Sequence, residues 1–198
     1  MPKQILLASN NPGKIREIQS LLSAYAMEIL PQGLFTKEEA EETGASFLEN
    51  ALIKARFAAA HSGLPAIADD SGLEVDALSG APGVYSARYA GPNATDADNN
   101  AKLLKELAEV EDNNRTARFR CVMVYVSNTE DTNPLVAEGV WEGVILREAR
   151  GNNGFGYDPL FFVPDQGCAS AELPPEVKNQ LSHRGQALRA LVTSIKAI

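Results

Sequence analysis

Cysteine and histidine are scarce in this 198-residue sequence, which has two of each. Cys121 and Cys168 form no CxxC pair, so neither a disulfide framework nor a zinc site is indicated. Cys121 opens a strongly apolar segment, and we expect it to be a buried, unreactive thiol. Two histidines are too few for a His-rich metal site. Any bound metal ion should therefore be a hard cation held by oxygen atoms.

Long apolar runs are also missing. The longest, Cys121–Val126 and Leu160–Val163, have the length of strands, whereas a membrane-spanning helix needs roughly 20 apolar residues. Residues Met1–Gln4 lead into a short apolar run without the hydrophobic region and cleavage site of a signal peptide. We therefore expect no membrane association and a cytoplasmic location.

Positive charge is in deficit, since the formal net charge is −8. No basic stripe is visible, so we expect no nucleic-acid partner. An acidic protein can still bind a phosphate chain where a few lysines and arginines converge and a metal ion assists. Hydrophobic residues make up 44% of the chain, enough for a globular core. No repeat or linker divides the chain, so we expect a single domain over residues 1–198.

Apolar periodicity predicts alternating strands and helices. Strands are expected at Lys3–Ala8, Leu64–Ala68, 73–77, Phe119–Val126, Leu135–Val140 and Leu160–Val163. Helices are expected from Pro12, from Ser46 to about Ala60, after Thr95 and Asp98, over Glu176–Leu181 and after Ser182. Asn11 can cap the first helix, and Ser46 with Glu49 has the spacing of a capping box. Interspersed strands and helices indicate an α/β fold around one mixed sheet.

The segment Ser9–Lys14 joins the first strand to the first helix. A helix N-terminus presents free backbone N–H groups and its dipole favours an anion, which Lys14 could also reach. The P-loop pattern GxxxxGK[ST] is absent. The alternative is an ordinary capped helix with a solvated lysine.

Acidic residues form the next candidate site. Asp69 and Asp70 are expected to end a buried strand, where adjacent carboxylates suit Mg²⁺. The alternative is a polar turn, because Asp-Ser-Gly is good turn chemistry. Asn50 and Lys54 share a helix face, and Glu42 becomes interesting only if it lies opposite Asp70. Aspartyl-phosphate phosphatases place Asp-x-Asp after such a strand, but the residue two past Asp70 is Gly72. Aspartic proteases carry Asp-Ser-Gly, but this chain has a single copy and little else in support.

Two later segments complete the set. In Gly154–Pro159, Phe155 and Tyr157 could sandwich a flat heterocycle while Asp158 accepts hydrogen bonds from it. The alternative is a loop pinned into the core by its aromatic rings. Lys178 and Ser182–Gly185 place three donors beside a helix N-terminus, where cations oppose the dipole unless an anion or ligand is present.

Seven short motifs then occur in order along nearly the whole chain. They are Ser9-x-Asn11-x-x-Lys14, Glu41–Gly44, Phe47-x-Glu49-Asn50-Ala51, Ala68–Gly72, Gly80–Arg88, Gly154–Pro159 and Ser182–Gly185. Together they resemble the inosine-triphosphate pyrophosphatase family, the pyrophosphatases of non-canonical purine nucleoside triphosphates. Ser9 stands where the family more often has threonine.

The resemblance implies a two-lobed mixed-sheet α/β fold with the active site in the cleft between lobes, usually in a homodimer. It implies Mg²⁺-dependent hydrolysis of ITP, dITP and XTP to the monophosphate and pyrophosphate. Asp70 would be the base for the attacking water, and Glu42 and Asp70 would hold Mg²⁺. The substrate would be bound by Ser9, Asn11, Lys14, Lys54, Ser71, Phe155, Gly156, Tyr157, Asp158, Lys178, His183 and Arg184.

Hydrogen-bond chemistry agrees with this specificity. Arg184 can only donate, so it suits the 6-keto oxygen of hypoxanthine or xanthine, whereas adenine would leave donors unpaired at about 1–3 kcal/mol each. How guanine is rejected does not follow from the sequence. Two alternatives are a pyrophosphatase of other altered nucleotides, such as modified pyrimidines, and a non-catalytic nucleotide sensor. The base-pocket motifs argue against the first, and the presence of both Glu42 and Asp70 argues against the second.

Overall fold

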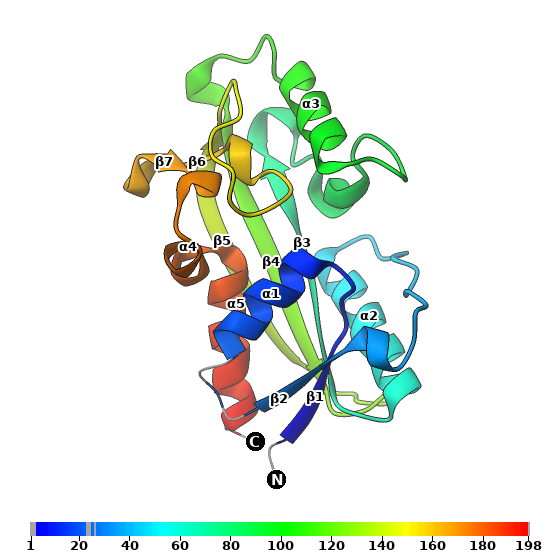
Figure 1. Cartoon of the computed structure of the whole chain (residues 1–198). Helices are drawn as coiled ribbons and strands as arrows, with labels where there is room; N and C mark the ends of the chain where they lie inside the picture. Colours follow the sequence, from blue (N-terminus) through cyan, green and yellow to red (C-terminus); the bar gives the residue numbers. More distant parts are fainter. Residues whose placement is uncertain (1–2, 23–24, 26, 198) are drawn as a thin grey trace. The chain divides into compact units, whose positions relative to one another are not determined.

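Seven strands form one mixed sheet in the computed structural model, which describes residues 3–22, 25 and 27–197 (Figure 1). The order is β2-β1-β3-β4-β5-β6-β7. The strands are β1 (Lys3–Leu7), β2 (Met27–Pro31), β3 (Ala66–Val75), β4 (Thr116–Val126), β5 (Leu135–Ile145), β6 (Phe161–Val163) and β7 (Cys168–Ala169). β1 pairs in parallel with β2 and β3, whereas β6 pairs antiparallel with β5 and β7. The predicted mixed-sheet α/β fold is confirmed.

Five α-helices connect or follow these strands in the described part of the chain. They are α1 (Pro12–Leu22), α2 (Phe47–Ser62), α3 (Asp96–Glu106), α4 (Pro175–Leu181) and α5 (His183–Lys196). All five lie where the sequence predicts helices. The side chain of Ser46 accepts a hydrogen bond from Glu49 N, but the Glu49 carboxylate bonds Ala45 N, so that capping box is only half formed. Thr95 and Asp98 form a complete one.

The chain divides into two compact units. Unit 1 comprises residues 1–70, 121–139 and 184–198, and unit 2 comprises residues 71–120 and 140–183. Strands β3, β4 and β5 each contribute residues to both units, and β3 changes unit between Asp70 and Ser71. Each unit has a hydrophobic cluster of its own.

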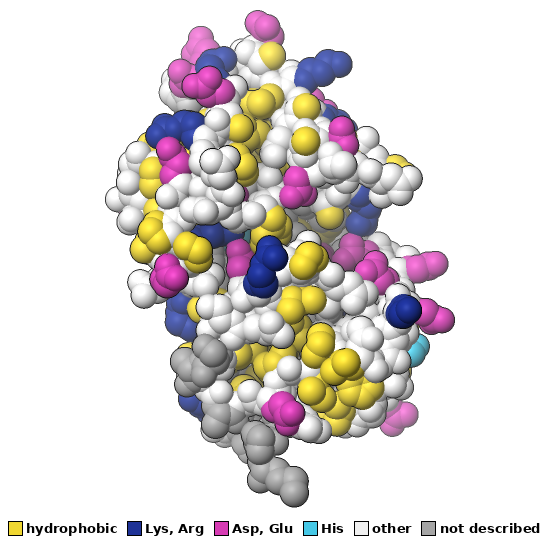
Figure 2. Space-filling model, viewed as in Figure 1, with side chains coloured by type: hydrophobic (Ala, Val, Ile, Leu, Met, Phe, Trp, Pro, Cys, Tyr) yellow, Lys and Arg dark blue, Asp and Glu magenta, His cyan; other side chains and the backbone are white. Residues whose placement is uncertain are grey.

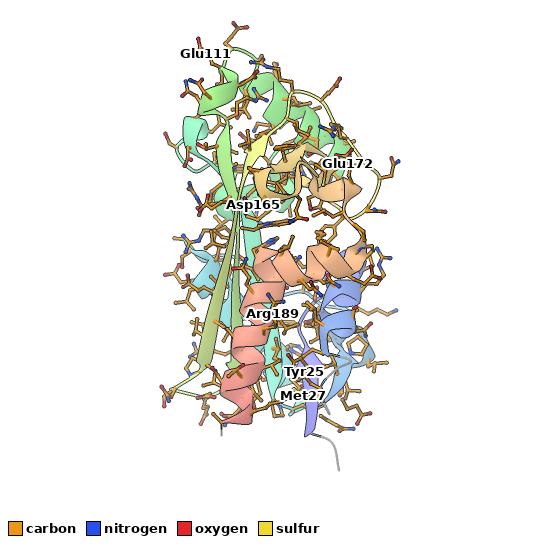
Figure 3. All side chains as sticks on the ribbon, turned by 90° about the vertical axis from the view of Figure 1, so that its left-hand side faces the viewer. Tyr25, Met27, Glu111, Asp165, Glu172 and Arg189 are labelled. Carbon is orange, nitrogen blue, oxygen red and sulfur yellow. The ribbon has the colours of Figure 1, made fainter. Side chains whose placement is uncertain are left out.

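In unit 1, helices cover both faces of the sheet. Side chains alternate along the strands, so Ile5, Ile67 and Met123 point to one face, where they pack with residues of α1 and α5. Figures 1 and 3 show α1 and α5 on that face and α2 on the other. The buried residues of α2 on that other face are mostly small, namely Ala51, Ala55, Ala58 and Ala59. Small side chains let the helix approach the sheet closely.

In unit 2, aromatic rings fill the core. The ring centroids of Phe119 and Phe161 are 4.5 Å apart, and those of Trp141 and Phe161 are 5.3 Å apart. Leu103 of α3 and Leu107, which follows the helix, are fully buried in the same cluster. The packing therefore fixes α3 against the sheet of this unit.

One strand prediction was wrong at its end. The strand expected to stop at Asp69 instead continues as β3 to Val75, joining two segments that the sequence separates. Both aspartates are buried inside this strand, which is possible because cations pair with each of them, as described below. Strand β2 and the two-residue strand β7 were not predicted.

No helix among the described residues has both the length and the apolar character that spanning a membrane requires.

Cys121 is buried in β4, and burial raises the pKa of its thiol. The expectation of an unreactive thiol agrees with this environment.

Candidate active site

Asp70 of β3 is held by two residues of α2. Lys54 Nζ lies 2.8 Å from Asp70 Oδ1, and the side-chain amide of Asn50 donates to Asp70 Oδ2 at 3.1 Å. Asn50 and Lys54 are four residues apart and therefore share a helix face, as predicted. Asp70 is only 6% exposed, so its carboxylate is both oriented and largely shielded from water.

Glu42 meets the same lysine. Lys54 Nζ lies 2.9 Å from Glu42 Oε1. The segment that carries Glu42 is fastened at Gly44, whose N–H donates to Asn50 Oδ1 at 2.8 Å. A Cβ on Gly44 would lie 2.6 Å from Glu49 Cβ and 2.7 Å from that oxygen, so this close approach needs glycine. Glu42 and Asp70 thus converge on one ammonium group.

Burial and the neighbouring opposite charges shift the pKa values of Asp70 and Lys54 in opposite directions. Burial raises the pKa of Asp70, and this outweighs the opposing effect of Lys54 and Lys14, while Glu42 raises the pKa further. For Lys54, burial alone would lower the pKa, but Asp70, Asp69 and Glu42 together raise it. Lys54 therefore stays charged, and Asp70 holds a proton more readily than an ordinary aspartate does.

Asp69 faces a different set of charges. Its Oδ2 lies 2.9 Å from Lys14 Nζ and 3.5 Å from Arg184 Nε. Arg184 Nη1 also lies 2.5 Å from Glu17 Oε2 on α1. Burial alone would raise the pKa of Asp69, but Lys14 and Arg184 hold it far below its usual range. Asp69 is thus a counterion, charged at neutral pH, that joins α1, β3 and α5.

The N-terminus of α1 differs from the expectation in one respect. Asn11 caps the helix as predicted, but its Oδ1 accepts from both Gly13 N and Lys14 N, at 2.9 and 3.1 Å. Those two N–H groups are therefore occupied by the cap instead of being free for an anion. Ser9 Oγ accepts from Asn11 N at 3.2 Å. An anion at this turn would rely on side-chain donors, chiefly Lys14.

In unit 2, Asp158 organises the glycine-rich loop. Its Oδ2 accepts from Lys178 Nζ at 2.6 Å and from Phe155 N at 2.8 Å, and its Oδ1 accepts from Ser170 Oγ at 2.9 Å. Gly154 has φ +77°, and a Cβ there would lie 2.0 Å from Asp158 Oδ2. Asp158 and Lys178 are both buried. The carboxylate is engaged within the protein, as in the alternative of a pinned loop.

The two aromatic rings of this loop have different surroundings. Tyr157 is buried in the core of unit 2, and its hydroxyl donates to Ser86 O at 2.8 Å. Phe155 is half-buried, and Lys178 Nζ lies 5.2 Å from its ring centroid. Tyr157 thus has the contacts of a structural anchor, whereas the Phe155 ring is only partly buried. Stacking by either ring on a base stays a prediction.

His183 and Arg184 are buried, at 4% and 3% exposure, and are not exposed first-turn residues. The His183 ring stacks on Phe119 with centroids 4.8 Å apart and planes 12° apart. His183 belongs to unit 2 and Arg184 to unit 1. Ser71 follows Asp70 in β3 and is partly buried.

Glu42 and Asp70 fit a hard divalent cation. Among the described residues, no group of three or more His, Cys, Asp or Glu side chains could hold a metal ion. Mg²⁺ needs no such group, because one or two carboxylates suffice when water and substrate phosphates supply the other ligands. Two carboxylates that already share one ammonium group match that requirement.

Three positioning residues were outside the predicted site set. Asn50 orients Asp70, Glu17 holds Arg184, and Ser170 donates to Asp158. Asn50 had a local signal, its four-residue spacing from Lys54. Glu17 and Ser170 had none, because Glu17 is 167 positions from its partner and Ser170 is an unremarkable serine.

Comparison with known proteins agrees with the resemblance seen in the sequence. A model of the Ham1 family matches residues 5–194. A dITP/XTP pyrophosphatase of Methylococcus capsulatus is 63% identical over 198 residues, covering 100% of this chain and 98% of the relative. One of Vibrio parahaemolyticus is 57% identical, covering 98% of each chain.

Solved structures agree as well. A HAM1 protein from Coxiella burnetii has a TM-score of 0.91 at 52% identity, covering 99% of this chain and 100% of its own. The Staphylococcus aureus Ham1 protein has a TM-score of 0.85 at 41% identity, covering 98% and 99%. On its buried carboxylate clusters, its fold and these matches, the chain belongs to the Ham1 family.

Proposed function

We propose that this protein hydrolyses non-canonical purine nucleoside triphosphates (ITP, dITP and XTP) to the nucleoside monophosphate and pyrophosphate. The observation that carries the proposal is the convergence of Glu42 and Asp70 on Lys54 Nζ, at 2.9 and 2.8 Å. The name dITP/XTP pyrophosphatase, borne by relatives 55–63% identical over almost the whole chain, supports the substrate class. Removal of deaminated purines from the nucleotide pool would be the purpose.

Unit 1 supplies the residues suited to the triphosphate. Its cluster contains the cations Lys14, Lys54 and Arg184 against four carboxylates, those of Glu17, Glu42, Asp69 and Asp70. Three positive against four negative charges leave −1, which would repel a triphosphate. A divalent cation such as Mg²⁺, held by Glu42 and Asp70, would reverse that balance and neutralise charge on the phosphates. Ser9, Asn11 and the two lysines would hold the phosphate oxygens.

Asp70 is the proposed base. The oxygen of a water molecule attacks the α-phosphorus, the bond from that phosphorus to the bridging oxygen breaks, and pyrophosphate leaves. Asp70 takes the proton that the attacking water loses. A raised pKa makes the carboxylate a stronger base once it is ionised. Asn50 and Lys54 fix its two oxygens, so the direction of proton transfer is set before the substrate arrives.

Unit 2 supplies the residues suited to the purine. We propose that Phe155 offers a ring face, that Gly156 and Tyr157 shape the loop, and that Asp158 acts with Lys178 and His183 around the base edge. Lys178 beside the Phe155 ring supports this, because a keto oxygen near the ring would find a donor there. Ser71 would line the substrate site. The contact of Arg184 with the 6-keto oxygen stays a prediction, since in the structure its partners are Asp69 and Glu17.

Three further parts of the proposal concern the whole protein. The two units act as one pyrophosphatase domain, the protein works in the cytoplasm, and it forms a homodimer. The homodimer rests on the resemblance to the family, and the other two are the expectations drawn from the sequence. Analytical ultracentrifugation of the purified chain tests the dimer directly.

A substrate panel tests the function. The protein is incubated with ITP, XTP, GTP and ATP in the presence of Mg²⁺, and the released anion is identified. We expect pyrophosphate from ITP and XTP, and little product from GTP or ATP. Orthophosphate as the product, or equal rates on ATP, would refute the proposal.

The Asp70→Asn variant tests the mechanism separately. Replacing the base should abolish turnover, while ITP binding measured by calorimetry largely persists because the lysines remain. Full activity in this variant would show that another group takes the proton, even if the substrate panel succeeds.

A further inference from the structure

Two side chains of α3 hold the peptide groups on both sides of Gly156. Gly156 N donates to Asp96 Oδ2 at 2.7 Å, and the side-chain amide of Asn100 donates to Gly156 O at 2.9 Å. Asp96 and Asn100 are four residues apart, so both project from the same face of the helix. Both contacts lie within unit 2.

These contacts fix more than one residue. The N–H of Gly156 belongs to the peptide plane shared with Phe155, and its C=O belongs to the plane shared with Tyr157. Gly156 has φ +62°, and glycine by itself allows many other conformations. Holding both planes therefore sets the directions in which Phe155 and Tyr157 leave the loop.

Helix α3 is a rigid support for this purpose. Its N-terminus carries the complete capping box of Thr95 and Asp98, and Leu103 and Leu107 are fully buried. Asn99, the neighbour of Asn100, holds a second loop by accepting from Ala90 N and donating to Ala87 O. The helix thus fastens two loops to one packed element.

Asn100 makes a single side-chain hydrogen bond. Its Oδ1 is buried and has no hydrogen-bond partner among the described residues, so the amide is oriented by Gly156 alone. Asn100 is therefore tied to the loop through one contact, its hydrogen bond to Gly156 O.

We propose that Asp96 and Asn100 are positioning residues for base recognition, which hold the Phe155–Tyr157 segment in the geometry that accepts a 6-keto purine. This inference rests on the proposed function. Neither residue belongs to the predicted site. Their loss should weaken binding of the purine and leave the phosphate chemistry intact.

The test compares Asn100→Ala and Asp96→Ala with two controls. Asp96→Asn keeps an acceptor oxygen for Gly156 N and should behave as wild type. Asp98→Ala weakens the start of α3 without touching Gly156, so it reports the effect of helix stability alone. For each protein, kcat and KM are measured with ITP, and hydrogen exchange is measured on the peptide covering residues 151–160.

We expect both alanine variants to raise KM for ITP about tenfold with kcat nearly unchanged, the pattern of lost binding that is equal in ground and transition states. Their 151–160 peptide should exchange faster, and both controls should match wild type. Faster exchange with unchanged KM would overturn the positioning role. Unchanged exchange would show that Asp96 and Asn100 do not hold the loop. An equal rise in KM for Asp98→Ala would assign the effect to helix stability. If the wild-type protein does not hydrolyse ITP, the proposed function is refuted. The exchange data then still show whether Asp96 and Asn100 hold the loop.

Discussion

At the scale of single residues, Asp69 and Asp70 are neighbours with opposite electrostatic states. Asp69 is flanked by Lys14 and Arg184, and its pKa is held far below the usual range. Asp70 shares its lysine with Glu42, and its pKa is raised, mainly by burial. The first is suited to be a fixed counterion and the second to exchange a proton.

Asp69→Asn should destabilise the protein by about 3 kcal/mol at pH 7, because it leaves a buried arginine and lysine without their shared carboxylate. The folded-state pKa of Asp69 is lowered, so its contribution is present above the unfolded value of about 3.9 and is lost as pH falls through the folded pKa. Urea unfolding of wild type and variant at several pH values measures this. The difference in unfolding free energy should shrink below about pH 4.

Asp70→Asn is the matched control for that measurement. Because the folded-state pKa of Asp70 is raised, its favourable contribution is complete below the unfolded value and is lost as pH rises through the folded pKa. At pH 7 the neutral variant should be at least as stable as wild type. Equal destabilisation by both substitutions would contradict the assignment of different roles.

At the scale of elements, α2 and the segment before it act together. The helix presents Asn50 and Lys54 to Asp70, and Gly44 docks on its first turn, which brings Glu42 to the same lysine. The docking depends on the missing side chain of Gly44. One glycine thus determines whether the second carboxylate reaches the site.

Gly44→Ala should lower kcat/KM for ITP by about tenfold or more, because a Cβ would push the Glu42 segment away from Asn50 and cost about 1–3 kcal/mol in overpacking. Gly33→Ala is the control, since a Cβ there meets nothing within 4 Å. Steady-state kinetics and urea unfolding of both variants measure the effect. Wild-type activity in Gly44→Ala would show that the segment can shift without loss.

At the scale of the whole molecule, negative charge dominates. The net charge is −8, and on the face shown in Figure 2 basic side chains are scattered among acidic ones without forming a continuous band. A polyanionic substrate therefore gains nothing from the general field of the protein. Its binding would depend on local cations and on the metal ion that we propose.

Chelation of divalent ions should consequently abolish activity. We expect EDTA to lower the rate of ITP hydrolysis by about a hundredfold or more and added Mg²⁺ to restore it, because the unit 1 cluster alone has an excess of negative charge. Thermal unfolding with and without EDTA is the control, and it should change little, since Glu42 and Asp70 already pair with Lys54. Full activity in EDTA would contradict the role of a metal ion.

Much of the fold could be predicted because its signals are local. The five helices followed from apolar periodicity and from caps such as Asn11 and Thr95, whose partners lie within three residues. The end of the β3 segment could not be predicted. Two adjacent aspartates usually indicate a turn. Here they lie inside a strand because cations from distant parts of the chain pair with them.

The amino-acid sequence was enough to predict the five helices, the family and the residue types available for the site. The pairing of those residues could be seen only in the folded protein. Arg184 is 115 positions from Asp69 and 167 from Glu17, and no spacing rule reaches that far. A charge takes its pKa and its role from the groups around it, and folding brings those groups from distant parts of the chain. In the sequence the two aspartates form one acidic motif, whereas in the folded protein the pKa of Asp69 is lowered and that of Asp70 is raised.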